Sequence, residues 1–250
     1  MVNVIGLGYI GLPTALMLAS HGVEVVGTDY NKEQVATLNA GRTTFKEDGL
    51  DELFAAAVKA GVRFLRSNAA KYCLDPDRFA VGGDSAGAYF AAMLGTSAGV
   101  AALEDYSMGN GGVSSAVQAV IGLFGVYDLV KQSRFTAEHE DMPGGMKMPN
   151  FADMFAGGIS CRDNPGLMSL TWPGSYVTKD CPPTLIQGGT ADEIVPYEAS
   201  PDLVNKINAV CGEGRAIMEP FEGRTHGHPD FGKPENVERM FAFLDGILKK

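Results

Sequence analysis

The sequence contains no hydrophobic run that approaches the length of a membrane span, and it has few residues of the kinds that bind metals or form disulfides. A transmembrane helix needs about 20 consecutive, mostly apolar residues. The 250 residues include one tryptophan, four histidines and four cysteines. Cys73, Cys161, Cys181 and Cys211 lack the close pairing of zinc ligands. We therefore expect no metal, and four buried, reduced thiols in a cytoplasmic protein.

Basic residues are also scarce, with 20 Lys and Arg against 30 Asp and Glu, which gives a net charge of −10. A chain this acidic repels phosphate backbones and anionic lipid. The N-terminus has neither the basic region nor the cleavage site of a signal peptide. We expect neither nucleic acid nor a membrane as a partner. The composition gives no indication of the oligomeric state.

Short apolar segments alternate with amphipathic ones along the chain. The apolar segments predict strands at residues 2–7, 23–27, 78–82, 117–124, 183–187 and 216–221. The amphipathic segments predict helices at residues 11–20, 32–40, 50–72, 85–94, 196–210 and 236–248. Fully apolar strands separated by helices are typical of a parallel sheet covered on both faces. We expect an α/β fold with one doubly wound, mainly parallel sheet of about six strands.

No linker composition marks a domain boundary, so residues 1–250 are predicted to form a single domain. A glycine- and methionine-rich stretch at residues 133–158 interrupts the alternation of strands and helices. Long irregular connections inside compact domains commonly form lids or pocket walls. We expect this stretch to be irregular and lid-like.

A Gly-x-Gly-x-x-Gly motif, formed by Gly6, Gly8 and Gly11, lies between the first predicted strand and the first helix. Asp29 follows the second predicted strand, 18 residues after Gly11. This layout is typical of dinucleotide sites, where glycines let the backbone approach a pyrophosphate and the carboxylate binds ribose hydroxyls. The alternative is that the glycines only build a tight crossover.

Residues 1 to about 54 carry the sequences GLGYIGLPTA, VGTDYN and LDELF. They resemble the N-terminal Rossmann-type βαβ segment of UDP-glucose/UDP-N-acetylmannosamine dehydrogenases. The resemblance implies that Gly6, Gly8, Gly11 and Asp29 match cofactor-contacting positions. It ends after about a fifth of the chain, before that family's remaining nucleotide-binding strands and catalytic cysteine motif. We therefore expect no cofactor, and we keep an NAD(H)- or nucleotide-binding module as an alternative function.

A second motif, Gly83-Asp-Ser-Ala-Gly87, lies between a predicted strand and an alanine-rich helix. A nucleophilic serine in a strand–turn–helix elbow needs small neighbours, because its backbone is strained and lies close to adjacent strands. The motif therefore makes Ser85 a candidate nucleophile. The alternative is an ordinary serine at the start of a helix.

The partners of such a serine follow it in the order acid, then histidine. Asp192 follows a predicted strand at its carboxyl end and is the first choice for the acid. Asp128 is a weaker candidate and fits a helix cap better, while Glu193 is expected to point elsewhere. His226 follows the last predicted strand and is the first choice for the base, with His228 as the alternative. A metal site on these two histidines is not favoured, because no pair of carboxylates accompanies them.

From about residue 55 to the C-terminus the chain contains YCLDPDRFAVGGDSAGAYFAAML, YVTKDCPPTLIQGGTADEIVPY and FEGRTHGHPDF, in that order. This part resembles α/β-hydrolase carboxylesterases of the hormone-sensitive-lipase-like and carbohydrate esterase branch. The resemblance implies Ser85 as nucleophile, Asp192 as acid and His226 as base. It also implies hydrolysis of a small-molecule acyl ester.

The chain departs from that family upstream of the serine, where the His-Gly-Gly loop that supplies half of the oxyanion hole is missing. It therefore resembles a chimera of the two families, joined near residues 54–64. We expect strand 2–7 to replace the oxyanion strand, which gives the sheet order second, first, third, fourth, fifth, sixth. The backbone N–H groups of Gly8 and Tyr9 would then join that of Ala86 in the oxyanion hole. The functions left open are an esterase of reduced activity, a catalytically poor hybrid scaffold, and a nucleotide-binding module.

Overall fold

A computed structural model describes residues 2–5, 25–29, 32, 35, 51–139 and 148–249. The strands are β1 (Val2–Ile5), β2 (Val25–Thr28), β3 (Ala80–Asp84), β4 (Ala119–Leu123), β5 (Thr184–Gly189) and β6 (Ala216–Phe221). The α-helices are α3 (Asp51–Ser67), α4 (Ala86–Thr96), α5 (Leu129–Glu138), α6 (Phe151–Phe155), α7 (Pro165–Met168), α8 (Ala199–Cys211) and α9 (Pro234–Leu248). Short 3-10 helices are η1 (Ala101–Leu103), η2 (Tyr106–Met108), η3 (Pro173–Tyr176) and η4 (Pro229–Gly232). None of the helices in these ranges is long and apolar enough to cross a membrane.

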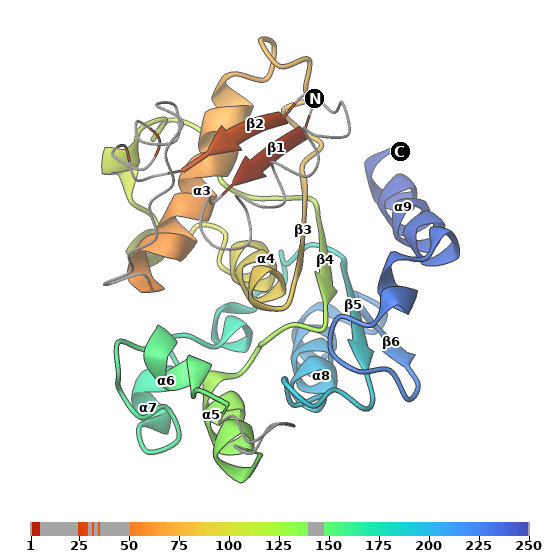
Figure 1. Cartoon of the computed structure of the whole chain (residues 1–250). Helices are drawn as coiled ribbons and strands as arrows, with labels where there is room; N and C mark the ends of the chain where they lie inside the picture. The colour runs from red at the N-terminus through yellow and green to blue at the C-terminus, as the bar shows by residue number, and fades with distance from the viewer. Residues whose placement is uncertain are drawn as a thin grey trace.

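The six strands form two separate parallel sheets (Figure 1). Strand β1 pairs with β2, and the second sheet has the order β3-β4-β5-β6. The predicted order of the last four strands is confirmed. The predicted single six-stranded sheet is wrong for the described residues, because β3 pairs there with β4 and not with β1. Strand β3 contains Gly82 and Gly83, so it offers a further strand little side-chain surface to pack against.

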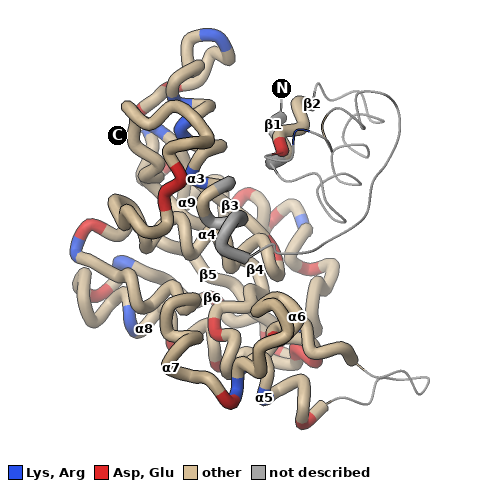
Figure 2. Tube along the Cα trace, turned by 90° about the vertical axis from the view of Figure 1, so that its left-hand side faces the viewer, with Lys and Arg blue, Asp and Glu red and all other residues tan. Residues whose placement is uncertain are grey.

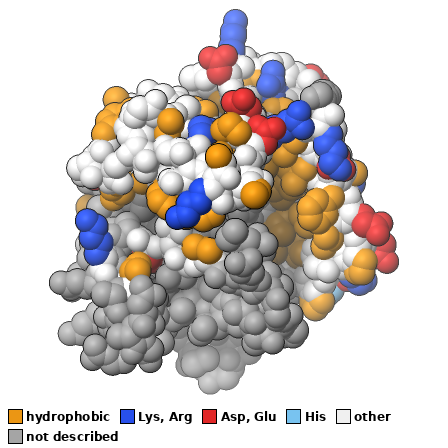
Figure 3. Space-filling view, turned by 90° about the horizontal axis from the view of Figure 1, so that it is seen from above, with side chains coloured by type: hydrophobic (Ala, Val, Ile, Leu, Met, Phe, Trp, Pro, Cys, Tyr) orange, Lys and Arg blue, Asp and Glu red, His pale blue; other side chains and the backbone are white. Residues whose placement is uncertain are grey.

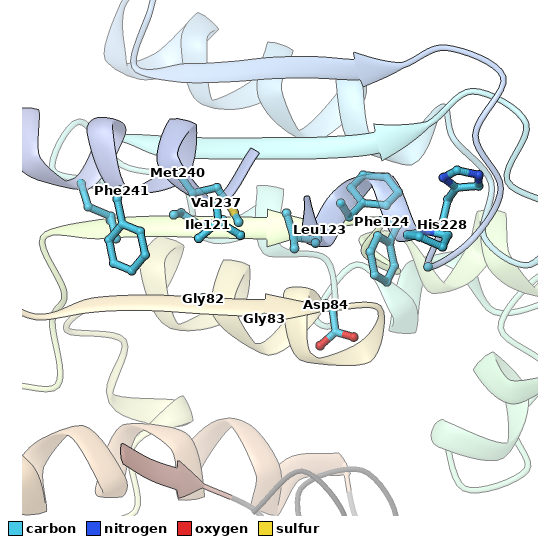
Figure 4. A pocket seen from close by; sticks show the side chains of 15 residues that line it. Gly82, Gly83, Asp84, Ile121, Leu123, Phe124, His228, Val237, Met240 and Phe241 are labelled. Atoms are coloured by element: carbon cyan, nitrogen blue, oxygen red, sulfur yellow. The ribbon is translucent and has the colours of Figure 1, made fainter. Parts of the chain in front are cut away.

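Consecutive side chains of β5 point to opposite faces of the four-stranded sheet. Ile186 packs into an apolar cluster with residues of α4 and α8. The buried amide of Gln187 points the other way, where its Nε2 donates to Oδ1 of Asn236 at 2.7 Å and its Oε1 accepts from Asn236 Nδ2 at 2.8 Å. Asn236 belongs to α9, which lies in front of β4 in Figure 4, with α4 behind it. Helices therefore cover both faces of this sheet.

Small residues bring α4 unusually close to the sheet. The cluster between α4, α8 and the strands consists of Ala88, Ala92, Tyr127, Ile186, Ala199, Leu203, Val204, Ile207 and Ala216. A Cβ at Gly95 would lie 2.4 Å from Cγ2 of Val120, so only glycine fits at that contact. Because α4 begins directly after Ser85, this close packing fixes the position of the serine at the carboxyl end of β3.

Helix α3 runs without a break through Gly61 and ends at Ser67, shorter than the predicted 50–72. Lys59 and Arg63 lie one helical turn apart, and both side chains are buried. Each forms an ion pair with Glu104, which follows η1. Desolvation lowers the pKa of Lys59, and the nearby Glu104 carboxylate opposes that shift. This buried charge cluster attaches α3 to the loop after α4.

Helices α5, α6 and α7 gather at one end of the molecule, at the bottom of both Figure 1 and Figure 2. Leu129, Ala152, Cys161 and Met168 form their shared apolar cluster. The stretch 133–158, expected to be irregular, contains the end of α5 and all of α6 in its described part. The expected irregular backbone is therefore wrong for residues 133–138 and 151–155, where Asn150 caps α6 by accepting a hydrogen bond from the N–H of Asp153. The lid-like role of the stretch stays a prediction.

The four cysteines are reduced, and the prediction that all four are buried holds for only two of them. Cys161 and Cys181 are buried, whereas Cys211 is half-buried and Cys73 is exposed. Cys73 lies in the turn after α3 with a φ of 54°, so its position is set by the turn rather than by the core.

Candidate active site

Ser85 occupies a sharp turn between β3 and α4. Its backbone has φ 51° and ψ −121°, a conformation that few residues other than glycine adopt. Its N–H donates to the carbonyl of Leu123 on β4 at 2.9 Å, which keeps the turn against the sheet. A Cβ at Gly83 would lie 2.3 Å from backbone atoms of Gly87. The glycine at position 83 is therefore required for strand and helix to approach each other around the serine.

Asp192 lies in the turn after β5, with its side chain 3% exposed. One carboxylate oxygen, Oδ1, accepts hydrogen bonds from the N–H groups of Ile194 and Val195, each at 2.9 Å. These bonds fix the carboxylate and leave Oδ2 free to accept from His226, whose Nδ1 is 2.8 Å away.

His226 lies in the loop after β6 and joins the acid to the serine. Its Nε2 is 3.0 Å from Oγ of Ser85, while its Nδ1 faces Asp192. The three side chains come from turns at the ends of β3, β5 and β6, separated by up to 141 positions in the sequence. The structure thus brings together the three residues chosen from the sequence, in the order serine, histidine, aspartate.

Direct backbone hydrogen bonds join the turn that carries Asp192 to the loop that carries His226. The N–H of Ala191 donates to the carbonyl of Arg224 at 3.1 Å, and that of Thr190 donates to the carbonyl of Phe221 at 3.1 Å. A Cβ at Gly189 would lie 2.1 Å from the Arg224 carbonyl oxygen. The acid and the base are therefore held in register by main-chain contacts as well as by their own hydrogen bond.

Ala86 is the first residue of α4, where helical N–H groups have no partner within the helix. Its N–H is therefore suited to stabilise a negative oxygen beside Ser85. The other two predicted donors, Gly8 and Tyr9, lie outside the described residues, as do Gly6 and Gly11 of the glycine motif. Asp29 is described and directly follows β2. The proposed replacement of the oxyanion loop stays a prediction.

The alternative residues have other structural roles. Asp128 caps α5, accepting hydrogen bonds from the N–H groups of Val130 and Lys131, as the sequence suggested. Glu193 is exposed. His228 caps η4, and its Nδ1 accepts from the N–H of Asp230 at 3.2 Å. Within the described ranges, no group of three His, Cys, Asp or Glu residues is arranged to hold a metal ion.

The replacement His228→Ala tests the assignment of His228 as a cap. We expect catalytic turnover to change by less than about twofold, because the imidazole binds a backbone N–H rather than the serine. Losing the cap should cost about 0.5–2 kcal/mol of stability, measured by urea unfolding. His228→Asn, which can cap in the same way, should regain most of that stability. A large loss of turnover in a folded His228→Ala protein would contradict this assignment.

An apolar groove of about 630 Å³ lies between β3, β4 and α9, next to the loop after His226 (Figure 4). Its lining includes Ile121, Leu123, Phe124, Val237, Met240 and Phe241. Figure 3 shows hydrophobic side chains in a hollow on the face seen from above. Phe124, at the end of the groove, also contacts His226. Phe124 is the last residue of the predicted strand 117–124, and nothing in the sequence pattern indicated its contact with His226.

A serine in a strained strand–turn–helix elbow, with an aspartate and a histidine on later strand-end turns of a parallel sheet, defines the α/β-hydrolase fold. The chain belongs to the family described as BD-FAE, whose model matches residues 51–207. It is 37% identical over 186 residues to Esterase LipQ of Mycobacterium tuberculosis, an alignment that covers 74% of this chain and 40% of that protein. The chain thus spans about two-fifths of the length of this relative.

A solved structure supports the same fold. A truncated form of a carbohydrate esterase from gut microbiota superposes with a TM-score of 0.63 and 27% identity, covering 78% of this chain and 68% of that one. The predicted resemblance of the larger part of the chain to esterases is therefore confirmed.

The N-terminal part matches a different family. Residues 1–85 match the NAD binding domain of the UDP-glucose/GDP-mannose dehydrogenase family. The chain is 53% identical over 60 residues to the NDP-N-acetyl-D-galactosaminuronic acid dehydrogenase of Ralstonia nicotianae, which covers 24% of this chain and 14% of that protein. Both predicted resemblances are confirmed, and the two family matches overlap in residues 51–85.

Proposed function

We propose that this protein is a serine carboxylesterase that hydrolyses small acyl esters through Ser85, His226 and Asp192. The observation that carries the proposal is the hydrogen-bonded series from Ser85 Oγ to His226 Nε2 at 3.0 Å and from His226 Nδ1 to Asp192 Oδ2 at 2.8 Å. Nucleophile, base and orienting carboxylate at these separations are what acyl transfer requires. The esterase relative and the carbohydrate esterase structure support the same class of substrate.

In the first half of the reaction, Ser85 Oγ attacks the ester carbonyl carbon while His226 Nε2 accepts the hydroxyl proton. Asp192 keeps the proton of His226 on Nδ1 and stabilises the imidazolium that forms. The bond to the alcohol then breaks, the alcohol leaves with the proton from His226, and the acyl group remains on the serine. In the second half, water attacks the acyl-serine, and the acid and free Ser85 are released.

The negative charge of each tetrahedral intermediate needs hydrogen-bond donors, and the N–H of Ala86 is one. The family's His-Gly-Gly loop does not occur in this sequence, so we propose that Gly8 and Tyr9 act in its place. Loss of one well-placed donor lowers the rate by about 10²–10³-fold. Because Gly8 and Tyr9 belong to a segment that matches another family, we propose that their N–H groups are aimed less well than the missing loop, and that turnover is below that of esterases that retain it.

Covalent labelling tests the proposed function directly. An organophosphate probe should add one phosphoryl group to Ser85, because phosphorylation needs the same activated oxygen as acyl transfer. Mass spectrometry of the digested protein locates the label, and a panel of p-nitrophenyl esters from acetyl to octanoyl measures turnover. His226→Ala should lose labelling and turnover together. Labelling confined to other residues, or equal in the His226 variant, would refute the proposal.

A further inference from the structure

Phe124 has a strained backbone directly beside the candidate active site. It follows β4 and has a φ of 39°, a region that bulky side chains rarely occupy. Its N–H donates to the carbonyl of Gln187 at 2.7 Å, which holds the residue against the end of β5. Strained residues persist where the surrounding structure fixes them, and they cluster at functional sites. The strained backbone therefore makes Phe124 a candidate for a functional role.

The ring of Phe124 lies against the imidazole of His226, with ring centres 4.9 Å apart and planes inclined by 73°. On another side it contacts Phe231 at 4.7 Å, and Phe231 stacks on Phe221 at 4.4 Å. Phe124 and Phe231 are both buried, at 8% and 4% exposure. Phe221, Phe231 and Phe124 therefore form a continuous row of contacting rings that ends at the imidazole of His226.

The same ring contacts His226 and also lines the apolar groove. Phe124 lines the groove, and His226 does not. Removing the ring would leave space beside the imidazole and connect it to the groove. The two hydrogen bonds of His226 fix where its nitrogens point, but a gap on one side would let the ring tilt away from them.

We propose that Phe124 is a positioning residue that holds the imidazole of His226 in line between Asp192 and Ser85. This inference rests on the proposed function, because positioning matters only if His226 transfers a proton. The strained backbone places the ring edge-to-face with the imidazole, a favoured aromatic geometry. Phe124 takes no chemical step of its own and acts through its ring contact with His226.

The test compares Phe124→Ala with Phe124→Gly. Both variants remove the ring, but glycine accepts a φ of 39° and alanine does not. We expect kcat to fall about ten- to a hundredfold in both, because small displacements of a proton-transfer group are costly. KM should stay within about twofold. The glycine variant should melt at a higher temperature than the alanine variant without regaining kcat.

Proton NMR adds a measurement that a purely structural role would not affect. The low-field signal of the Nδ1–H proton that His226 shares with Asp192 should broaden or disappear in both variants, as its exchange with water quickens. Phe135→Leu, which removes a partly exposed ring from α5, is the matched control and should leave the signal and kcat unchanged.

The outcomes separate the two proposals. If Ser85→Ala abolishes turnover while both Phe124 variants keep the parent kcat and the low-field signal, the positioning role is wrong and the esterase proposal stands. If glycine restores kcat in step with stability, Phe124 is structural only, and the inference also fails. If Ser85→Ala leaves turnover unchanged, the proposed function fails first, and the role of Phe124 fails with it.

Discussion

Replacing Ser85 by alanine is expected to lower kcat for p-nitrophenyl acetate by at least about 10³-fold, because no other atom can form the acyl-enzyme. The fold should be unaffected, since the Ser85 hydroxyl faces His226 and the turn is held by its backbone N–H. Steady-state kinetics at matched concentrations of the parent and variant proteins measures the loss. Circular dichroism checks that the variant is folded.

The Ser85→Ala/His226→Ala double variant sharpens this prediction. If the two residues act as one unit, the double variant should be about as slow as either single variant. Once one residue is replaced, the other no longer contributes to the rate, so replacing it as well has little further effect on kcat. Ser169→Ala, which removes an exposed hydroxyl, is the matched control and should keep the parent rate. Losses that multiply in the double variant would contradict a shared mechanism.

The second large effect is expected at Glu104, far from the serine. Glu104→Leu would leave Lys59 and Arg63 buried without their carboxylate partner. Leaving a buried charge unpaired lowers the free energy of unfolding by about 3–5 kcal/mol. The remaining acceptors, the carbonyls of Ser97, Asp105 and Gly109, are uncharged and cannot neutralise the two positive charges. Urea unfolding should therefore show a large drop in midpoint. Turnover per folded molecule should change little.

Two further variants test the cause of this effect. The triple variant Lys59→Met/Arg63→Met/Glu104→Leu should recover much of the lost stability, because it removes the stranded charges. Asp75→Ala breaks the exposed ion pair with Arg78 and should cost less than about 1 kcal/mol. If Glu104→Leu is no worse than Asp75→Ala, the buried cluster contributes little to stability.

The esterase-like part of the chain could be predicted closely from sequence because its signals are local. The glycines around Ser85 are required by contacts that any such turn creates, and the strands before Asp192 and His226 are short and apolar. A serine, an acid and a histidine that each follow a parallel strand must meet at one edge of a sheet. Their hydrogen-bonding distances agree with that reasoning.

The single six-stranded sheet could not be predicted reliably, because strand pairing depends on surfaces that a linear pattern does not specify. Strands β1 and β2 pair with each other and are covered by the dehydrogenase-family match alone, whereas β3 lies where the two family matches overlap. A strand pattern shows that a segment can pair, but the neighbour is chosen by side-chain fit. Phe124 was missed for a related reason, since its left-handed backbone and aromatic contacts exist only in three dimensions.

The main-chain bonds of Thr190 and Ala191 to the loop before His226 also affect how the site loses its order. Proteins open locally in cooperative segments, and segments bonded together open together. Any fluctuation that frees Asp192 from its turn therefore also frees His226. Asp192 and His226 should therefore lose and regain their ordered positions together, and under the proposed mechanism no partly ordered state would transfer a proton.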